Sequence, residues 1–419
     1  MTSIAENAAS YFVDRHLEER RGDGIAYREA GSGRTLSYHD LAKGAAQCAG
    51  SLRRAGVRRE ERVAVLVHDT LEFTQILFVA LKAGVIPIPV NTLLTASVYD
   101  HILRDSRAVC LFVSAALYET VAPILSENPY LRQIIVIGGG DEPETTQYEA
   151  FVKGAERLDT QPVSADEVAF WLYSSGSTGQ PKGVAHVHAS LRATADTYGA
   201  HILQLSQEDT VFSAAKLFFA YGLGNALTFP LAVGATAVLF PGRPTPQDML
   251  DTLNAEKPTV FYGVPTLFAA MNAEMDKSGR PDAPLRRAVS AGEALPEDVG
   301  KRWQDHTGVP ILDGVGSTEM LHIFLSNAPD DVVYGTSGTP VPGYEMRLVD
   351  DNGEEVETGE IGELVVSGAS SAACYWNQRR KSQATFEGAW THTGDKYEQR
   401  PDGRYIYCGR TDDMFKVSG

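Results

Sequence analysis

Short apolar runs rich in β-branched residues recur along most of the chain. A first series comprises residues 62–67 (RVAVLV), 109–113 (VCLFV) and 134–137 (IIVI). A second series comprises residues 210–212, 235–240, 259–262 and 287–290. Segments long enough for a helix separate the runs in both series. This alternation is typical of an α/β fold with largely parallel sheets, so the two series predict two α/β layers.

The pattern changes near residue 346, where short alternating runs flank a turn. The runs are residues 346–349, 363–366 and 405–407, and the turn is residues 350–353 (DDNG). Such runs are typical of antiparallel strands. We therefore expect a first α/β subdomain at residues 1–190, a second at residues 191–340 and a β-rich subdomain at residues 341–411.

Length and charge limit the classes of partner. The 419 residues exceed the roughly 100 to 200 expected for one domain, which agrees with several subdomains. The 37 basic and 54 acidic side chains leave a formal charge of −17, which disfavours nucleic acid and acidic membranes as partners. A small anion can still bind locally. The sequence leaves the oligomeric state open, a homodimer included.

The cysteines and the apolar runs bear on the compartment. The four cysteines, Cys48, Cys110, Cys374 and Cys408, are far apart and form no CxxC pair. We expect reduced thiols rather than disulfides or zinc ligands. The N-terminus has no basic stretch followed by an apolar one, and no apolar run approaches the length of a membrane span. These features favour the cytoplasm and predict no membrane segment.

A loop of small hydroxyl residues carries the strongest chemical signal. An apolar strand, residues 169–173 (AFWLY), runs into residues 174–183 (SSGSTGQPKG). The candidate phosphate ligands in the loop at residues 174–183 are Ser174, Ser175, Gly176, Ser177, Thr178, Gly179 and Lys182. The glycines let the backbone approach an anion, the hydroxyls donate hydrogen bonds, and the lysine adds charge. Pro181 precedes the lysine where a Walker loop requires glycine, so the nucleotide-hydrolase interpretation is disfavoured.

Two other patterns point to structure rather than chemistry. His186 and His188 alternate along a strand-like segment, but no third ligand lies nearby, so packing is favoured over a metal pair. Residues 138–140 (GGG) follow a strand, yet the acidic residues and proline that come next break the dinucleotide-binding pattern.

The loop at residues 174–183 resembles the phosphate-binding signature of the adenylate-forming superfamily, which includes acyl-CoA synthetases, luciferases and adenylation domains of peptide synthetases. Four further segments resemble other signatures of that superfamily, in the same order along the chain. They are residues 290–294 (SAGEA), 313–319 (DGVGSTE), 393–395 (TGD) and 409–413 (GRTDD).

The resemblance implies roles for individual residues in binding ATP. It places the backbone of Gly292, Glu293 and Ala294 along the adenine, and it assigns Asp313 and Gly314 to the nucleotide-binding acidic motif. In that motif Thr318 would contact the α-phosphate and Glu319 would hold Mg²⁺. Asp395 would accept hydrogen bonds from both ribose hydroxyls, and Arg410 would also reach the ribose.

The resemblance also implies an αβαβα layered large domain with a small antiparallel β-subdomain. The superfamily has a mobile C-terminal domain that supplies a catalytic lysine, and we expect this chain to lack it. Asp412 would be the hinge, and residues 412–419 would begin the missing domain. Lys182 and Lys416 should therefore not be mistaken for that lysine.

Two segments predict the acid. Residues 213–224 (SAAKLFFAYGLG) and 316–324 (GSTEMLHIF) resemble benzoate-type aryl-CoA ligases. Planar rings need apolar walls, so we expect a slot lined by Ala220, Tyr221, Gly222, Gly316, His322 and Ile323. The His322 ring or the Tyr221 hydroxyl would meet a ring substituent, which leaves benzoate, anthranilate and hydroxybenzoate open. Lys216 is a candidate catalytic residue that would offset the carboxylate charge. Core packing is the alternative for Tyr221, and a solvated surface position is the alternative for Lys216.

The sequence therefore predicts an enzyme that uses ATP and Mg²⁺ to convert an aromatic acid to an acyl-adenylate, releasing pyrophosphate. Coenzyme A then accepts the acyl group as a thioester. A medium-chain acyl-CoA ligase and a module that only binds acyl-adenylate are the alternatives.

Overall fold

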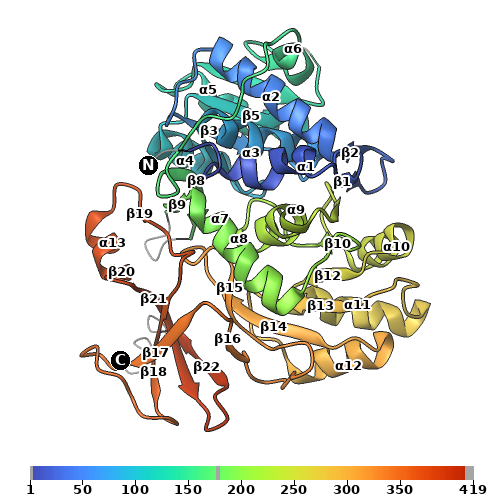
Figure 1. Cartoon of the computed structure of the whole chain (residues 1–419), viewed down its shortest axis with the longest axis vertical. Coiled ribbons are helices and arrows are strands. Elements are labelled where there is room, and N and C mark those ends of the chain that lie inside the picture. Colours follow the sequence, from blue (N-terminus) through green and yellow to red (C-terminus); the bar gives the residue numbers. More distant parts are fainter. Residues whose placement is uncertain (1–2, 141, 176–179, 411–419) are drawn as a thin grey trace.

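Two largely parallel sheets form the body of the chain (Figure 1). The computed structural model describes residues 3–140, 142–175 and 180–410. The strand order is β4-β3-β5-β6-β7 in the first sheet and β16-β15-β14-β13-β12-β10-β11-β1-β2 in the second. A three-stranded sheet, β19-β9-β8, and an antiparallel sheet of β17, β18, β21, β20 and β22 complete the described part of the chain.

The first sheet is parallel throughout. Its strands are β3 (Arg62–Leu66), β4 (Ile86–Pro89), β5 (Cys110–Ser114), β6 (Gln133–Ile137) and β7 (Thr146–Gln147). Its helices are α2 (Tyr38–Arg54), α3 (Leu71–Ala83), α4 (Ala96–Ser106), α5 (Ala115–Leu125) and α6 (Tyr148–Val152). Successive side chains of a strand point to opposite faces. Accordingly, Val63 and Val65 pack with α2 and α3, whereas Ala64 and Leu66 pack with α4 and α5.

Local signals fix the ends of several helices. The Ser37 hydroxyl accepts a hydrogen bond from the Asp40 amide at 3.0 Å and caps the start of α2. Helix α3 ends at Gly84, whose φ of 67° lies in the left-handed region that only glycine adopts readily.

The second sheet has a parallel centre and antiparallel edges. Its central strands are β10 (Thr210–Ser213), β11 (Thr236–Leu239), β12 (Val260–Gly263), β13 (Arg287–Ser290) and β14 (Ile311–Gly316). Its remaining strands are β1 (Ile25–Glu29), β2 (Thr35–Ser37), β15 (Ile323–Ser326) and β16 (Thr339–Pro340). Strand β1 runs parallel to β11, while β2, β15 and β16 each pair antiparallel with a neighbour.

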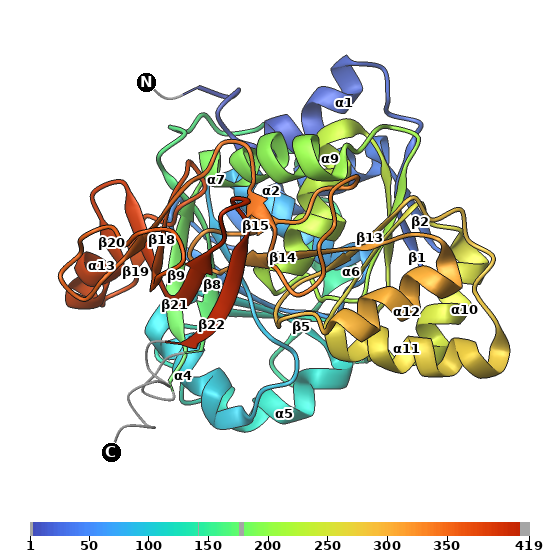
Figure 2. The same ribbon diagram turned by 90° about the horizontal axis from the view of Figure 1, so that it is seen from below.

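Helices cover both faces of this sheet. One face carries α10 (Pro246–Glu256), α11 (Pro265–Ser278) and α12 (Glu297–Thr307), which lie together in Figure 2 and pack on Phe212 and Phe261. The other face carries α7 (His188–Thr194), α8 (Ala220–Leu223), α9 (Phe229–Val233) and the π-helical segments η2 (Ala195–Leu203) and η3 (Gly224–Thr228). The N-terminal segments η1 (Ser10–Asp14) and α1 (Arg15–Glu18) lie on the same core.

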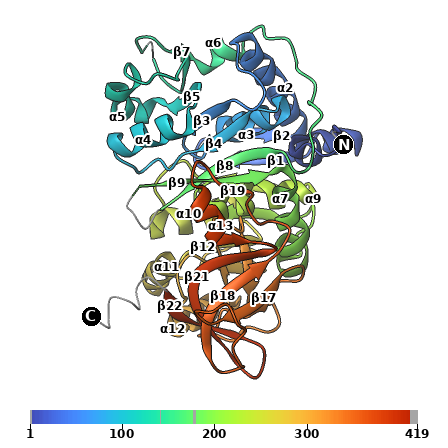
Figure 3. The ribbon, with the colours of Figure 1, turned by 90° about the vertical axis from the view of Figure 1, so that its left-hand side faces the viewer.

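A hairpin and a β-rich subdomain join these layers. The hairpin is β8 (Val168–Ser174) with β9 (Lys182–Val187), and Figure 3 shows it between the first sheet and the rest. The later elements are β17 (Glu345–Val349), β18 (Ile361–Ser367), β19 (Cys374–Tyr375), α13 (Arg379–Thr385), β20 (Phe386–Glu387), β21 (Trp390–Gln399) and β22 (Tyr405–Arg410). The pairings within the β-rich sheet are antiparallel.

The predicted fold class, an α/β body with a small antiparallel β-subdomain, is confirmed. Two pairings cross the predicted subdomain limits. Strand β1 joins the second sheet although it precedes residue 190, and β19 pairs with β9 although it follows residue 341. The exact limits therefore remain predictions.

Candidate active site

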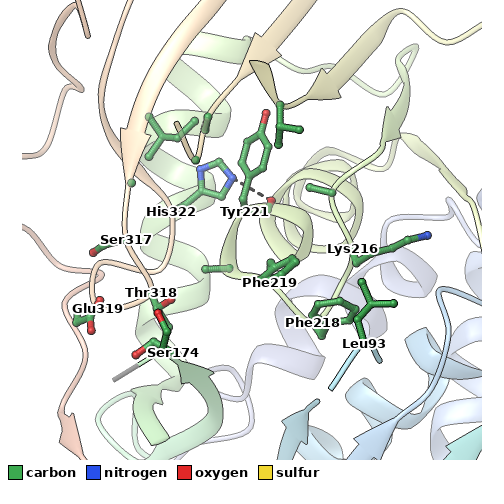
Figure 4. Close-up of a pocket in the computed structure, with 18 of the residues that line it drawn as sticks. Leu93, Ser174, Lys216, Phe218, Phe219, Tyr221, Ser317, Thr318, Glu319 and His322 are labelled. Atoms are coloured by element: carbon green, nitrogen blue, oxygen red, sulfur yellow. Dashed lines mark hydrogen bonds between the residues drawn. The ribbon is translucent and has the colours of Figure 1, made fainter. Parts of the chain in front are cut away.

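A cavity of about 1470 Å³ lies where the second sheet, the β8–β9 hairpin and the β-rich subdomain meet. Residues that follow β10, β12 and β13 line it, as does the segment from the end of β14 toward β15. The carboxyl ends of parallel strands are the usual position of ligand sites in such sheets. Figure 4 shows the part of the cavity that contains residues of the predicted aryl and phosphate sites.

Most predicted site residues that the structure describes line this one cavity. They are Ser174, Ser175, Lys182, Lys216, Ala220, Tyr221, Gly292, Gly316, Thr318, Glu319, His322, Ile323, Asp395 and Arg410. Gly222, Glu293, Ala294, Asp313 and Gly314 are not among its lining residues. Gly176, Ser177, Thr178, Gly179 and Asp412 lie outside the described residues.

At the phosphate end, the strand register brings the two ends of the loop together. Ser174 on β8 pairs with Lys182 on β9. The Lys182 ammonium donates to Glu319 Oε1 at 3.0 Å and to the Tyr375 hydroxyl at 2.8 Å. Burial would raise the pKa of Glu319, but the Lys182 charge and the Tyr375 hydrogen bond hold it below its usual value. Burial lowers the pKa of Lys182 against the opposing attraction of Glu319. A cationic donor and a carboxylate therefore share this part of the cavity.

A tight turn presents Thr318 and Glu319 on one side and His322 on the other. The His322 amide donates to the Met320 carbonyl at 2.9 Å, which closes a γ-turn around Leu321. Leu321 has a φ of 67°, which is unusual for a side chain of this size and marks local backbone strain. The Nε2 atom of His186 lies 2.8 Å from the Thr318 carbonyl, so we place the ring proton on Nε2. His186 therefore supports the turn, in agreement with the predicted packing role.

At the ribose end, two antiparallel strands bring Asp395 and Arg410 together. The register of β21 and β22 sets these residues opposite each other. Arg410 Nη1 donates to Asp395 Oδ1 at 2.9 Å. Burial raises the pKa of Asp395 to about 6, although the Arg410 charge opposes the shift. The pairing of the two predicted ribose ligands is thus observed, while their contact with ribose remains a prediction.

At the adenine end, Gly292 lines the cavity with a φ of 96°, a conformation that favours glycine. Glu293 and Ala294 follow it and are exposed. Asp313 is buried within β14, and this burial raises its pKa to about 8. Its Oδ1 atom has no hydrogen-bond partner within the described parts of the chain. Packing explains the glycine at position 314, because a Cβ there would lie 2.8 Å from Ile323 Cγ2.

The His322 ring lines the cavity at the predicted aryl slot. This ring packs against Tyr198, Tyr221 and Phe229, with centroids 5.2, 5.6 and 4.5 Å away. Its Nε2 atom lies 3.1 Å from Asn225 Oδ1 and 3.3 Å from the Tyr221 carbonyl. Both partners are acceptors, so Nε2 carries the proton. Burial lowers the pKa of His322 to about 3, which keeps the ring neutral.

Two predicted slot residues have different surroundings from those expected. The Tyr221 hydroxyl donates to the Val289 carbonyl at 3.1 Å, so it is turned to the backbone rather than to a ring substituent. Gly222 packs on the preceding loop, since a Cβ there would lie 2.1 Å from the Lys216 carbonyl. The phenol ring of Tyr221 still lines the cavity.

The Lys216 ammonium is already bound by the protein. It donates to the carbonyls of Phe240 and Gly242, the latter at 2.6 Å, and lies 3.9 Å from Asp69 Oδ2. Its side chain extends away from Thr318 and His322 in Figure 4. Burial raises the pKa of Asp69 to about 6. The predicted catalytic role of Lys216 remains a prediction, and the structure adds a contact with a buried carboxyl.

Sequence reasoning missed several lining residues. They are His68, Leu93, Glu363, Tyr375 and His392. Phe218 and Phe219, which belong to the segment that predicted the acid pocket, also line the cavity. Tyr375 and His392 lie close in sequence to predicted elements but in no quoted motif, and only the pairing of β19 with β9 indicates that Tyr375 approaches Lys182.

None of the helices in residues 3–140, 142–175 and 180–410 combines the length and the apolar character that a membrane span requires. These same residues contain no group of three His, Cys, Asp or Glu side chains placed to hold a metal ion.

Comparisons with known proteins agree with this geometry. The family described as AMP-binding enzyme matches residues 13–376. A benzoate–CoA ligase of Thauera aromatica is 51% identical over 416 residues, which cover 99% of this chain and 78% of that protein. A 4-hydroxybenzoate–CoA/benzoate–CoA ligase of Rhodopseudomonas palustris is 49% identical over 417 residues, which cover 99% of this chain and 76% of that protein.

Solved structures give the same result. A benzoate CoA ligase from Burkholderia xenovorans LB400 superposes with a TM-score of 0.91 at 46% identity, covering 98% of this chain and 81% of that one. The anthranilate CoA ligase AuaEII in complex with anthranoyl-AMP superposes with a TM-score of 0.94 at 39% identity, covering 97% and 78%. The predicted resemblance is confirmed, and the chain belongs to the family of AMP-binding enzymes.

Proposed function

We propose that this chain is an AMP-forming acid–thiol ligase that activates benzoate, or a benzoate with a small ring substituent, and transfers it to coenzyme A. One observation carries the proposal. A single cavity connects the apolar slot at His322 with the Lys182–Glu319 pair and then with the Asp395–Arg410 pair. These three portions match the aryl, phosphate and ribose parts of an aryl-adenylate. The relatives with the names given above act on acids of this class.

In the first step, a carboxylate oxygen attacks the α-phosphorus of ATP in line, and pyrophosphate leaves. Lys182 supplies positive charge where the phosphates lie, and Thr318 adds a hydroxyl donor at the same wall. Positioning and charge stabilisation contribute most to this type of transfer. No covalent bond to the enzyme is required.

Glu319 is the residue that would hold Mg²⁺. Its carboxylate lines the phosphate portion of the cavity, and one carboxylate together with nucleotide phosphates is a common way to bind this cation. When bound, Mg²⁺ supplies positive charge to the phosphate oxygens.

In the second step, the thiol of coenzyme A loses its proton to solvent and the thiolate sulfur attacks the acyl carbonyl carbon of the adenylate. The bond from that carbon to the phosphate oxygen breaks, and AMP leaves with its electron pair. Asp395 and Arg410 hold the ribose of the leaving AMP in this proposal, and the apolar slot keeps the aryl group fixed.

The slot favours a flat ring over a chain. The His322 ring is packed among three aromatic rings and closes the end of the slot, where a medium-chain acid would need further length. We also propose that the protein acts in the cytoplasm, since its four cysteines are free thiols, as a reducing compartment favours. A homodimer remains a proposal for its oligomeric state.

The test is pyrophosphate release by the full-length protein with benzoate, 2-aminobenzoate, hydroxybenzoates and octanoate, with and without coenzyme A. Selective turnover of one aryl acid, with its CoA thioester as the product, would support the proposal. Preference for octanoate would overturn the aryl slot. Failure with every acid would favour a module that only binds acyl-adenylate.

A further inference from the structure

The segment between β18 and β19 reaches across to the turn that carries Glu319. The Ala372 amide donates to the Glu319 carbonyl at 2.8 Å. The Ser370 hydroxyl donates to the Met320 carbonyl at 2.8 Å. The segment between β18 and β19 therefore fixes the backbone of two successive residues, Glu319 and Met320, in the turn at residues 318–322.

Tyr375, at the end of this segment, touches both charges of the phosphate portion. Its hydroxyl donates to Glu319 Oε1 at 2.8 Å and accepts from Lys182 Nζ at 2.8 Å. Its ring centroid lies 3.9 Å from the same Nζ atom, a cation–π distance. A hydroxyl can donate once and still accept, so one side chain can serve both partners.

The strand register explains why Tyr375 reaches Lys182. In the antiparallel pair of β19 and β9, Tyr375 is opposite Val184. Lys182 is two residues from Val184, so it lies diagonally on the same face, within reach of an aromatic side chain. The Tyr375 amide donates to the Ser382 hydroxyl at 3.0 Å, and the residue is only 4% exposed. Strand pairing, this hydrogen bond and burial together hold Tyr375 in place.

We propose that Tyr375 is a positioning residue for metal–nucleotide binding, which sets Lys182 and Glu319 at a fixed separation through its hydroxyl and its ring. This inference rests on the proposed function, because it takes the Lys182–Glu319 pair as the place where phosphates and cation meet. Tyr375 acts through these two residues and has no chemical step of its own.

The alternative is that Tyr375 only stabilises the β9–β19 pairing. The two roles differ in what a hydroxyl deletion changes. A residue that only supports the fold should affect all ligands alike, whereas a positioning residue should affect the metal–nucleotide complex and spare the aryl acid.

The test is Tyr375→Phe in the full-length protein, with affinity for ATP plus Mn²⁺ and for benzoate measured by calorimetry. Loss of hydrogen bonds to two charged groups should weaken ATP–Mn²⁺ binding by about 10-fold to 100-fold. Benzoate affinity should stay within about twofold of the unmodified protein. Among the described residues, no hydrogen bond or ring contact joins Tyr375 to His322 or to the aromatic rings around it.

Tyr38→Phe is the matched control. Tyr38 is also buried, and its hydroxyl donates to the Ala235 carbonyl, which does not line the cavity. This change should lower the melting temperature without altering ATP–Mn²⁺ affinity. Ser382→Ala is a milder second variant, which loosens the Tyr375 backbone and should weaken ATP–Mn²⁺ binding alone, by a few-fold.

A double-mutant cycle with Glu319→Gln gives the decisive comparison. Positioning through Glu319 predicts that Tyr375→Phe costs much less affinity in the Glu319→Gln background than alone. Unchanged ATP–Mn²⁺ affinity in Tyr375→Phe, equal loss of benzoate affinity, or additive effects in the cycle would overturn the inference. These binding measurements do not depend on turnover, so they remain informative if the protein activates none of the acids tested.

Discussion

Gly224→Ala tests whether the packing around His322 sets the affinity for the aryl acid. A Cβ at residue 224 would lie 2.4 Å from His322 Cδ2, 2.8 Å from Nε2 and 2.9 Å from Phe229 Cζ. Carbon atoms pack best at about 3.5–4.0 Å, so the His322 ring must move by roughly 1 Å. Tyr198 and Tyr221 pack against the same ring and resist that movement. Gly224 begins η3 with right-handed helical dihedral angles, φ −61° and ψ −54°, which alanine also adopts, so the effect is steric alone.

The expected magnitude follows from overpacking. Extra methyl groups in packed sites cost about 1–3 kcal/mol. Replacing a helical glycine by alanine returns about 0.5–1 kcal/mol, so the net loss of folding stability should be small. If the ring movement mainly narrows the slot, the cost of overpacking appears as lost binding free energy, and benzoate affinity should fall by about 5-fold to 150-fold.

The assay is benzoate affinity and ATP affinity, measured on the same preparations. Gly199→Ala is the control, because its Cβ would meet the same Phe229 ring at 3.4 Å, an ordinary contact, and should leave both affinities unchanged. Benzoate affinity within twofold of normal in Gly224→Ala would refute the assignment of His322 to the slot wall. Equal loss of benzoate and ATP affinity would indicate general misfolding instead.

The remaining predictions concern charged groups. Glu319→Ala should abolish Mg²⁺-dependent adenylate formation in a pyrophosphate-release assay, and near-normal rates would refute its role. Nucleotide affinity measured by calorimetry should fall as the pH drops through about 6, since burial raises the pKa of Asp395 to that value and protonation removes the charged acceptor; Asp395→Asn should lack this dependence. Burial raises the pKa of Asp313 from 3.8 to about 8. Between pH 3.8 and pH 8 the folded chain therefore binds more protons at this residue than the unfolded chain does. The free energy of unfolding falls as the pH rises through this range, by at most about 1.4 kcal/mol per pH unit. Urea unfolding at pH 5 and pH 8 should therefore show a smaller difference in Asp313→Asn. Lys216→Met should lower the melting temperature by several degrees, because it leaves Asp69 buried without its cation, and a loss of adenylation rate with an unchanged melting temperature would contradict this structural role.

The sequence predicted the local elements well, and most of its candidate site residues that the structure describes line one cavity. The apolar run at residues 62–67 became β3, and the turn at residues 350–353 is closed by a hydrogen bond from the Gly353 amide to the Asp350 carbonyl. The predicted ribose residues Asp395 and Arg410 are neighbours on paired strands. Residues of a short motif are close along the chain, so local backbone structure alone is enough to place them near one another.

Long-range pairings and side-chain directions could not be predicted. Strand β1 pairs with β11, with Tyr27 opposite Ala237, and no local pattern marks a partner so distant in sequence. The Tyr221 hydroxyl turns to the Val289 carbonyl because that carbonyl is supplied by a strand far along the chain. Tyr375 was missed for the same reason, since its meeting with Lys182 depends on the register of β19 and β9. A sequence shows which groups are available, whereas tertiary packing decides which of them meet.

The most direct test of the central claim is the affinity of the chain for non-hydrolysable acyl-adenylate analogues, in which a sulfamate replaces the phosphate. One analogue would carry a benzoyl group and the other an octanoyl group, with the adenosine portion identical. An aryl slot closed by His322 predicts at least about tenfold tighter binding of the benzoyl analogue. Equal affinity, or tighter binding of the octanoyl analogue, would contradict an aryl-adenylate site in this cavity.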